Sequence, residues 1–213
     1  SKNADRGVCE RDETLLSSKK KCLTRKDIMQ MKLEIRFSGS GGQGLITAAR
    51  VIAKTAVMDN NNALQSQTYG AEARGGATKS EVIISSEKIY FPEVLSPDIV
   101  LVTTQEAYQK YGRSMNKPGL VVVDSFTVKD FSEQESWRVI ALPFTGFAER
   151  EFHHKILMNM MISGFLVGIL HPVLTIDSFK IALQDFFSDD KLEKNKLASQ
   201  FGYDQAIQKN LHI

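Results

Sequence analysis

The fold is decided by residues 33–57, which read LEIRFSGSGGQGLITAARVIAKTAV. The first five residues have the β-branched and aromatic composition of a short strand, and a glycine-rich turn, SGSGGQG, follows them. Apolar side chains then recur at the spacing of one helix face, namely at Leu45, Ala48, Ala49, Ile52, Ala53 and Ala56. A strand that passes through glycines directly into a helix predicts an α/β domain.

The rest of the chain continues this alternation before it becomes helical. Strand patterns occupy residues 64–68, 78–85, 88–91, 98–103, 120–124 and 137–142. Helical patterns occupy residues 105–115, 148–170 with a break near 152–154, 175–187 and 189–210. We predict an α/β fold with a mostly parallel, Rossmann-like sheet in three layers and a helical C-terminal region. Residues 78–85 and 88–91 alternate like an inserted β-hairpin that turns at residues 85–87.

Charge separates a tail from one predicted domain. The whole chain has 27 Lys and Arg against 25 Asp and Glu, but residues 1–30 alone have 8 against 5, which leaves 19 against 20 for residues 31–213. We interpret residues 1–30 as a polar tail that is disordered, left over from cloning, or an arm for a partner. Residues 31–213 are predicted to be a single, near-neutral domain. Such a domain has no basic stripe for a phosphate backbone, so we expect no nucleic-acid partner.

The residue types that bind metals are few. Both cysteines, Cys9 and Cys22, lie in the first thirty residues at a spacing that matches no common metal site. An iron–sulfur cluster usually takes four thiolates, so this chain cannot hold one unaided. His153 and His154 are adjacent and point to different faces of a helix, so we interpret them as solvated or capping residues.

The longest apolar run, residues 156–170, is too short to span a bilayer and is interrupted by Asn159 and Ser163. We predict that it forms a buried helix, with Met158, Met160 and Met161 filling the core or an assembly face. The protein is therefore expected to be cytoplasmic and without membrane insertion.

The glycine turn satisfies the pattern G-x-G-x-x-G between a strand and a helix, which is the context that phosphate-binding turns need. Its glycines let backbone N–H groups approach a phosphate at the positive end of the helix. An NAD site also needs an acid at the end of the second strand, but residues 65–67 read QSQ and Asp59 precedes this strand. Three interpretations stay open: strand–helix packing alone, an NAD site, or contact with another phosphate-bearing group or a partner's backbone.

Three segments together carry a more specific signal: SGSGGQGLITAARVIA at 38–53, QTYGAEARGGATKSEV at 67–82 and SPDIVLVTTQEA at 96–107. In this order and at these separations they closely resemble the gamma subunit, or gamma-type domain, of 2-oxoacid:ferredoxin oxidoreductases. The resemblance covers about residues 33–170 and includes two separate loops. It is greatest to gamma subunits of the 2-oxoglutarate enzyme, although the pyruvate and branched-chain enzymes share the same loops.

The resemblance implies a heteromeric enzyme that oxidatively decarboxylates a 2-oxoacid, transfers the acyl group to coenzyme A and passes two electrons to ferredoxin or a similar acceptor. In such enzymes thiamine diphosphate, Mg²⁺ and iron–sulfur clusters are held mainly by other subunits. The expected partners are alpha and beta subunits, with or without a ferredoxin-like delta subunit. We expect no catalytic residue in this chain and no activity from it alone.

Both matching loops follow strands, so we expect them at the carboxyl edge of the sheet, where open α/β folds bind ligands. Thr104 and Ser125 follow later strands and are expected at the same edge. Arg74 can grip a phosphate or carboxylate in bidentate fashion, or it can pair with Glu72 and only fix the loop. We hypothesise that this edge holds the phosphate-bearing end of coenzyme A. The predicted binding residues are Gly39, Ser40, Gly41, Gly42, Gln43, Gly44, Tyr69, Glu72, Arg74, Gly75, Gly76 and Thr103.

Two functions of other classes compete with this hypothesis. One is a free-standing nucleotide-binding dehydrogenase, against which stand the missing ribose acid and the lack of a clear catalytic His–Asp or Lys constellation. The other is an interaction module that orders its partners without touching any ligand.

Overall fold

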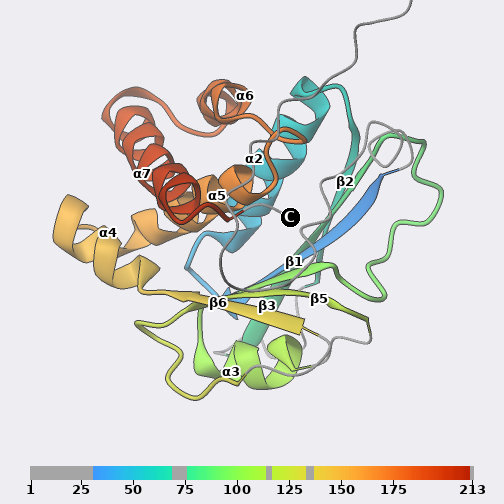
Figure 1. Ribbon diagram of the computed structural model, residues 1–213. Coiled ribbons are helices and arrows are strands. Elements are labelled where there is room, and N and C mark those ends of the chain that lie inside the picture. Colours follow the sequence, from blue (N-terminus) through green and yellow to red (C-terminus); the bar gives the residue numbers. More distant parts are fainter. Residues whose placement is uncertain (1–30, 69–75, 114–116, 133–136, 212–213) are drawn as a thin grey trace, which may run out of the picture.

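A six-stranded sheet forms the centre of the protein. The computed structural model describes residues 31–68, 76–113, 117–132 and 137–211. The strands lie in the order β2-β3-β1-β4-β5-β6 (Figure 1). Neighbouring strands among β1, β4, β5 and β6 pair in parallel, as predicted. The bounds are β1 Lys32–Ser40, β2 Asn62–Thr68, β3 Ala77–Ser85, β4 Ile99–Val102, β5 Gly119–Asp124 and β6 Trp137–Leu142.

Strand β3 runs antiparallel to both of its neighbours. It pairs with β1, where Ser40 lies opposite Ala77, and with β2, where Thr68 lies opposite Lys79. The prediction of a hairpin between residues 78–85 and 88–91 is wrong, because both edges of β3 are already hydrogen-bonded and residues 88–91 form no strand. Tyr90 in that segment is 85% exposed. The hairpin of this fold is the β2–β3 pair.

Helices cover the two faces of the sheet unequally (Figure 1). The thick layer on one face contains α2 Leu45–Met58, α5 Met158–Ile169, α6 Ile176–Ala182 and α7 Asp189–Gln208, with α4 Phe144–Phe152 where β6 ends. Two 3₁₀ turns, η2 Lys155–Leu157 and η3 Leu183–Asp185, connect these helices. The thin layer on the other face consists of α3 Gln105–Ala107 and the π-helical turn η1 Tyr108–Gly112. This arrangement is the predicted three-layer α/β fold, with a helix at 105–115 that is shorter than predicted.

Alternation along β1 sends side chains into two separate cores. Ile35 and Phe37 are buried beneath the thick layer. Arg36 points to the thin layer, where it is 7% exposed and pairs with Glu81 of β3 at 2.7 Å. A buried guanidinium needs such a partner, since an unpaired charge in the interior is costly. In β4 all four residues are buried, as expected of a parallel strand that is covered on both faces.

Helix α5 is buried along its whole length. All twelve of its residues are buried, which confirms that residues 156–170 contain a core helix, and the predicted break at 152–154 separates it from α4. Within the described ranges, no helix is long and apolar enough to cross a membrane. The backbones of α5 and α7 approach closely, because a Cβ atom at Gly164 would lie 1.9 Å from the Ser199 carbonyl oxygen and one at Gly202 would lie 1.8 Å from the Met161 carbonyl oxygen.

We predict that Gly202→Ala lowers the free energy of unfolding by about 3 kcal/mol, because the added methyl group would force α7 away from the α5 backbone. Urea unfolding followed by circular dichroism measures this change. Gly41→Ala is the matched control, since a Cβ atom there would have no neighbour within 4 Å. Equal stability of the two variants would show that the helix contact does not need glycine.

Candidate functional site

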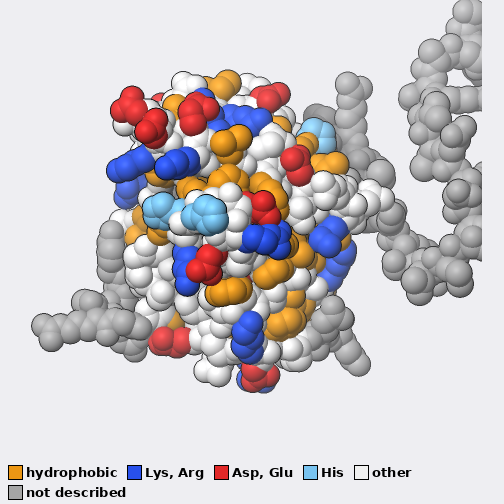
Figure 2. All heavy atoms as spheres, turned by 90° about the vertical axis from the view of Figure 1, so that its left-hand side faces the viewer, with side chains coloured by type: hydrophobic (Ala, Val, Ile, Leu, Met, Phe, Trp, Pro, Cys, Tyr) orange, Lys and Arg blue, Asp and Glu red, His pale blue; other side chains and the backbone are white. Residues whose placement is uncertain are grey.

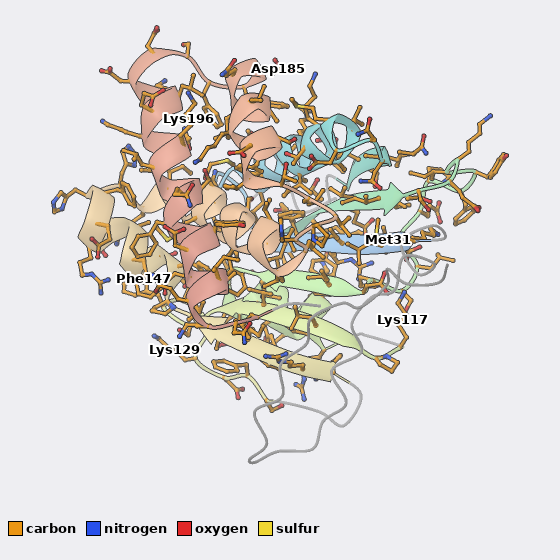
Figure 3. The ribbon with its side chains drawn as sticks, turned by 45° about the horizontal axis from the view of Figure 1, so that its top comes forward. Met31, Lys117, Lys129, Phe147, Asp185 and Lys196 are labelled. Atoms are coloured by element: carbon orange, nitrogen blue, oxygen red, sulfur yellow. The ribbon has the colours of Figure 1, made fainter. Side chains whose placement is uncertain are left out.

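The glycine turn lies at the carboxyl edge of the sheet, where β1, β4, β5 and β6 end. Figure 2 looks onto this side of the molecule. In Figure 3, Lys129 and Phe147 lie toward this edge, whereas Met31 and Lys117 lie toward the opposite one. Thr103 and Thr104 follow β4 and Ser125 follows β5, so the structure brings these residues and the glycine turn to one edge, as predicted.

Two glycines of the turn are required by close contacts. A Cβ atom at Gly39 would lie 2.0 Å from Thr103 Oγ1 and 2.3 Å from Gln43 Oε1. Gly44, which caps the N-terminus of α2, has φ +73°, and a Cβ atom there would lie 2.2 Å from Asn159 Nδ2. A side chain at either position would push the turn away from the sheet or from α5.

Gln43 and Thr103 stabilise the turn through side-chain hydrogen bonds. Gln43 Oε1 accepts hydrogen bonds from Ser40 N at 2.8 Å and from Thr103 Oγ1 at 2.7 Å. The Thr103 side chain is fully buried, and its hydroxyl also lies 3.2 Å from the Ser38 carbonyl oxygen. These two predicted binding residues therefore hold the backbone of the turn in place, which is a positioning role.

The tip of the turn is open. Gly41 and Gly42 are exposed, and Cβ atoms at both positions would have no neighbour within 4 Å. No side chain caps the N-terminus of α2, and its first turn contains no acid. The unpaired N–H groups and the helix dipole give this end a partial positive charge. The tip can thus present backbone donors to an anion without steric obstruction.

Of the second predicted loop, the structure describes the last residue, Gly76. Ala77, the first residue of β3, pairs with Ser40, so the preceding Gly76 lies next to the glycine turn. Thr78 Oγ1 also donates to the Gly39 carbonyl oxygen at 3.3 Å. Tyr69, Glu72, Arg74 and Gly75 lie outside the described residues, and their role in binding stays a prediction.

Thr104 and Ser125 already take part in local contacts at this edge. Thr104 Oγ1 accepts from Ala107 N and so caps α3. The Ser125 carbonyl oxygen accepts from Lys129 Nζ at 2.8 Å, which holds this cation at the carboxyl edge. Lys129 also lies over the Phe126 ring, 5.7 Å from its centroid. The sequence did not single out Lys129, because a lone lysine after a strand has no distinctive pattern.

Asp124 is a buried carboxylate at the end of β5 that was missed as a site residue. It accepts hydrogen bonds from Phe126 N and from both the backbone N–H and the hydroxyl of Thr145, and so ties β5 to the first turn of α4. Burial raises the pKa of Asp124 above its ordinary value, and the hydrogen bonds from Thr145 and Phe126 act in the opposite direction. The available signal was the acid that ends the apolar run LVVVD.

The topology argues against a dinucleotide site. In such a site the second strand lies parallel to and beside the first, so that an acid at its end reaches the ribose. Here antiparallel β3 lies between β1 and β2. Asp59 lies at the other end of α2, about 20 Å from the glycine turn for a helix of 14 residues. Its carboxylate accepts from Thr175 N and Oγ1 and from Ser178 Oγ, which is a structural role.

The two histidines lie at the end of α4 and are exposed. His153 is the C-cap residue in a left-handed conformation, in agreement with the interpretation as a capping pair. In the part of the chain that the structure describes, no three His, Cys, Asp or Glu residues come together as a metal site would require.

We predict a specific pH dependence from Asp124. Because the folded state holds this proton more tightly than the unfolded chain, the free energy of unfolding of the wild type, relative to Asp124→Asn, should fall as pH rises from about 3.9 through the raised pKa. The slope is at most about 1.4 kcal/mol per pH unit, the limit for one proton. Urea titrations of both proteins at several pH values measure it, and a relative rise would contradict the assigned shift.

Comparison with known proteins gives one consistent family. Residues 34–205 match the family described as pyruvate ferredoxin/flavodoxin oxidoreductase. The 2-oxoglutarate synthase subunit KorC of Methanocaldococcus jannaschii is 39% identical over 180 residues, which cover 84% of this chain and 96% of that protein. The pyruvate synthase subunit PorC of the same organism is 30% identical over 180 residues, with coverage of 83% and 98%.

Solved structures of similar fold come from the same kind of enzyme. The gamma subunit of a keto/oxoacid ferredoxin oxidoreductase from Geobacter sulfurreducens matches with a TM-score of 0.74 and 34% identity, over 84% of this chain and 98% of that chain. A chain of the 2-oxoglutarate:ferredoxin oxidoreductase from Magnetococcus marinus also has a TM-score of 0.74, but at 24% identity and over 31% of its length it shows the fold alone. These matches do not favour a free-standing dehydrogenase. The chain belongs to the pyruvate ferredoxin/flavodoxin oxidoreductase family, as a gamma-type subunit of a 2-oxoacid:ferredoxin oxidoreductase, which confirms the resemblance carried by its loops.

Proposed function

We propose that this chain is the gamma subunit of a 2-oxoglutarate:ferredoxin oxidoreductase and that the carboxyl edge of its sheet holds the phosphate-bearing end of coenzyme A. Relatives named as 2-oxoglutarate synthase subunits are 33–39% identical to it, against 30% for a pyruvate synthase subunit and 28% for a ketoisovalerate oxidoreductase subunit. The Magnetococcus enzyme, one chain of which shares this fold, was solved with 2-oxoglutarate, coenzyme A and succinyl-CoA bound.

The open tip of the glycine turn is the observation that carries the coenzyme A proposal. Gly41 and Gly42 present backbone to solvent at the uncapped, positive end of α2. A phosphate oxygen is a suitable acceptor for such N–H groups and a suitable charge for the helix end. The same edge carries the Lys129 ammonium group, which adds positive charge on the β5 side.

The redox centres belong, in this proposal, to partner subunits. Residues 31–213 contain no cysteine, so the family domain of this chain offers no thiolate for an iron–sulfur cluster. The two thiols of residues 1–30 are fewer than a cluster usually takes. Alpha and beta subunits, with or without a delta subunit, then supply thiamine diphosphate, Mg²⁺ and the clusters, and ferredoxin or another carrier accepts the electrons.

We predict that the chain purifies from its native host with larger subunits and that the complex reduces ferredoxin fastest with 2-oxoglutarate. Assays with 2-oxoglutarate, pyruvate and 3-methyl-2-oxobutanoate in the presence of coenzyme A make the comparison, and the isolated chain is the control without activity. A complex that prefers pyruvate would refute the choice of substrate, and a chain that turns over alone would refute the division of labour.

A charge at the tip of the turn tests the coenzyme A site. Gly41→Asp introduces a carboxylate where there is room for a side chain, so we predict that the fold is kept and the affinity of the complex for coenzyme A falls about tenfold or more. Isothermal titration of the assembled complex measures the Kd, with Gly41→Ala as the uncharged control. If both variants bind coenzyme A as the wild type does, the edge does not hold its phosphates, as expected of a pure interaction module.

A further inference from the structure

The N-termini of two helices meet at the glycine turn. Gly44 is the N-cap residue of α2, and Asn159 is the second residue of α5. A Cβ atom at Gly44 would lie 2.2 Å from Asn159 Nδ2 and 3.9 Å from Ile156 Cδ1, so the start of α2 touches the start of α5. The last glycine of the turn is thus required by a residue 115 positions further along the chain.

This contact brings two partial positive charges together. The N-terminus of a helix carries roughly half a unit of positive charge. Neither α2, with 14 residues, nor α5, with 12, has an acid in its first turn, and no side chain caps α2. The described part of the protein therefore places two like helix ends side by side without a negative charge in either first turn. A bound anion would convert this repulsion into attraction.

The side chain of Asn159 supplies an independent sign of a ligand. It is 6% exposed, and its Oδ1 accepts from Met160 N at 2.6 Å. That bond fixes the amide so that Nδ2 points to Gly44. Nδ2 donates to no acceptor within the described residues, yet it keeps contact with solvent. Because the described residues offer it no acceptor, this amide group is free to donate to an oxyanion, with which it would form a charge-assisted and therefore stronger hydrogen bond than with water.

We propose that Asn159 Nδ2 and the first-turn N–H groups of α2 form a binding site for a phosphoryl oxyanion. Backbone donors come from the glycine turn and α2, the amide donor comes from α5, and both helix ends contribute positive charge. The inference rests on the proposed function in naming a phosphate of coenzyme A as the natural ligand. Free phosphate shares the same chemistry, so the site can be tested on this chain without coenzyme A.

The first test introduces a carboxylate side chain at the position where the proposed site would hold an anion. Asn159→Asp keeps the oxygen that accepts from Met160 N and puts a carboxylate in place of the amide group. We expect a higher Tm without phosphate, because the carboxylate then compensates both helix ends, and an affinity for inorganic phosphate that is lower by about tenfold or more. Asn62→Asp is the matched control, since it makes the same charge change at an exposed position at the opposite end of the sheet. An unchanged phosphate response in Asn159→Asp would overturn the proposal.

A second measurement does not depend on any variant. Titration of the full-length, ¹⁵N-labelled wild-type chain with inorganic phosphate at constant ionic strength should shift the side-chain amide of Asn159 and the backbone amides of Gly44, Leu45 and Ile46. Amides around Asn62 should stay in place. If the Asn159 side-chain signals do not move at any phosphate concentration in the titration, the site does not exist.

The source of the phosphate is decided on the assembled complex. If Asn159→Asp and Gly41→Asp both weaken coenzyme A binding, the ligand of this site is coenzyme A. If the isolated chain binds phosphate at Asn159 but neither substitution changes coenzyme A affinity, the anion site is confirmed and its proposed role in coenzyme A binding is refuted. If Gly41→Asp alone weakens coenzyme A binding and phosphate does not shift the side-chain signals of Asn159, the coenzyme A function is supported and the anion site at Asn159 is refuted.

Discussion

Strand β1 is hydrogen-bonded along both of its edges, and this double pairing determines where everything else in the site lies. Parallel pairing with β4 aligns the end of β1 with Thr103, whose hydroxyl then reaches Gln43 in the turn. Antiparallel pairing with β3 brings Ala77 opposite Ser40, so Gly76, the residue before β3, lies beside the glycine turn. One strand thus brings together two backbone positions, Ser40 and Ala77, that are 37 residues apart in sequence.

The same pairing removes the possibility of a nucleotide cofactor bound in the usual manner. A dinucleotide needs two adjacent parallel strands on that side of the crevice, but β3 separates β2 from β1. The glycine turn keeps the local geometry of a phosphate-binding turn without the ribose-binding strand. The proposed function requires no more than this turn, because it assigns phosphate recognition to this chain and redox chemistry to its partners.

The helical layer positions two buried polar residues, Asn159 and Asp124, near the carboxyl edge of the sheet. Close contact between the α5 and α7 backbones at Gly164 and Gly202 covers one side of α5, and Asn159 lies buried at the N-terminal end of this helix, against Gly44. Asp124, in turn, binds the start of α4 through Thr145 and anchors the helices that follow to the end of β5. Asn159 and Asp124 are both buried polar residues, and each makes a contact with a residue that is distant in sequence.

Local sequence patterns were sufficient for most elements and for the sheet edge at which the candidate site lies. The strand–turn–helix unit of residues 33–57, the buried helix around Phe165 and the strand at Trp137–Leu142 follow from periodicities that act within a few residues. Pairing between strands is a different matter, since backbone hydrogen bonds to a distant segment leave no local mark. For this reason residues 88–91 were wrongly paired with β3, although β1 and β2 already occupied its edges. The contact between Asn159 and Gly44 is likewise decided only by the tertiary structure, because a polar residue in an apolar run does not say which distant backbone it will face.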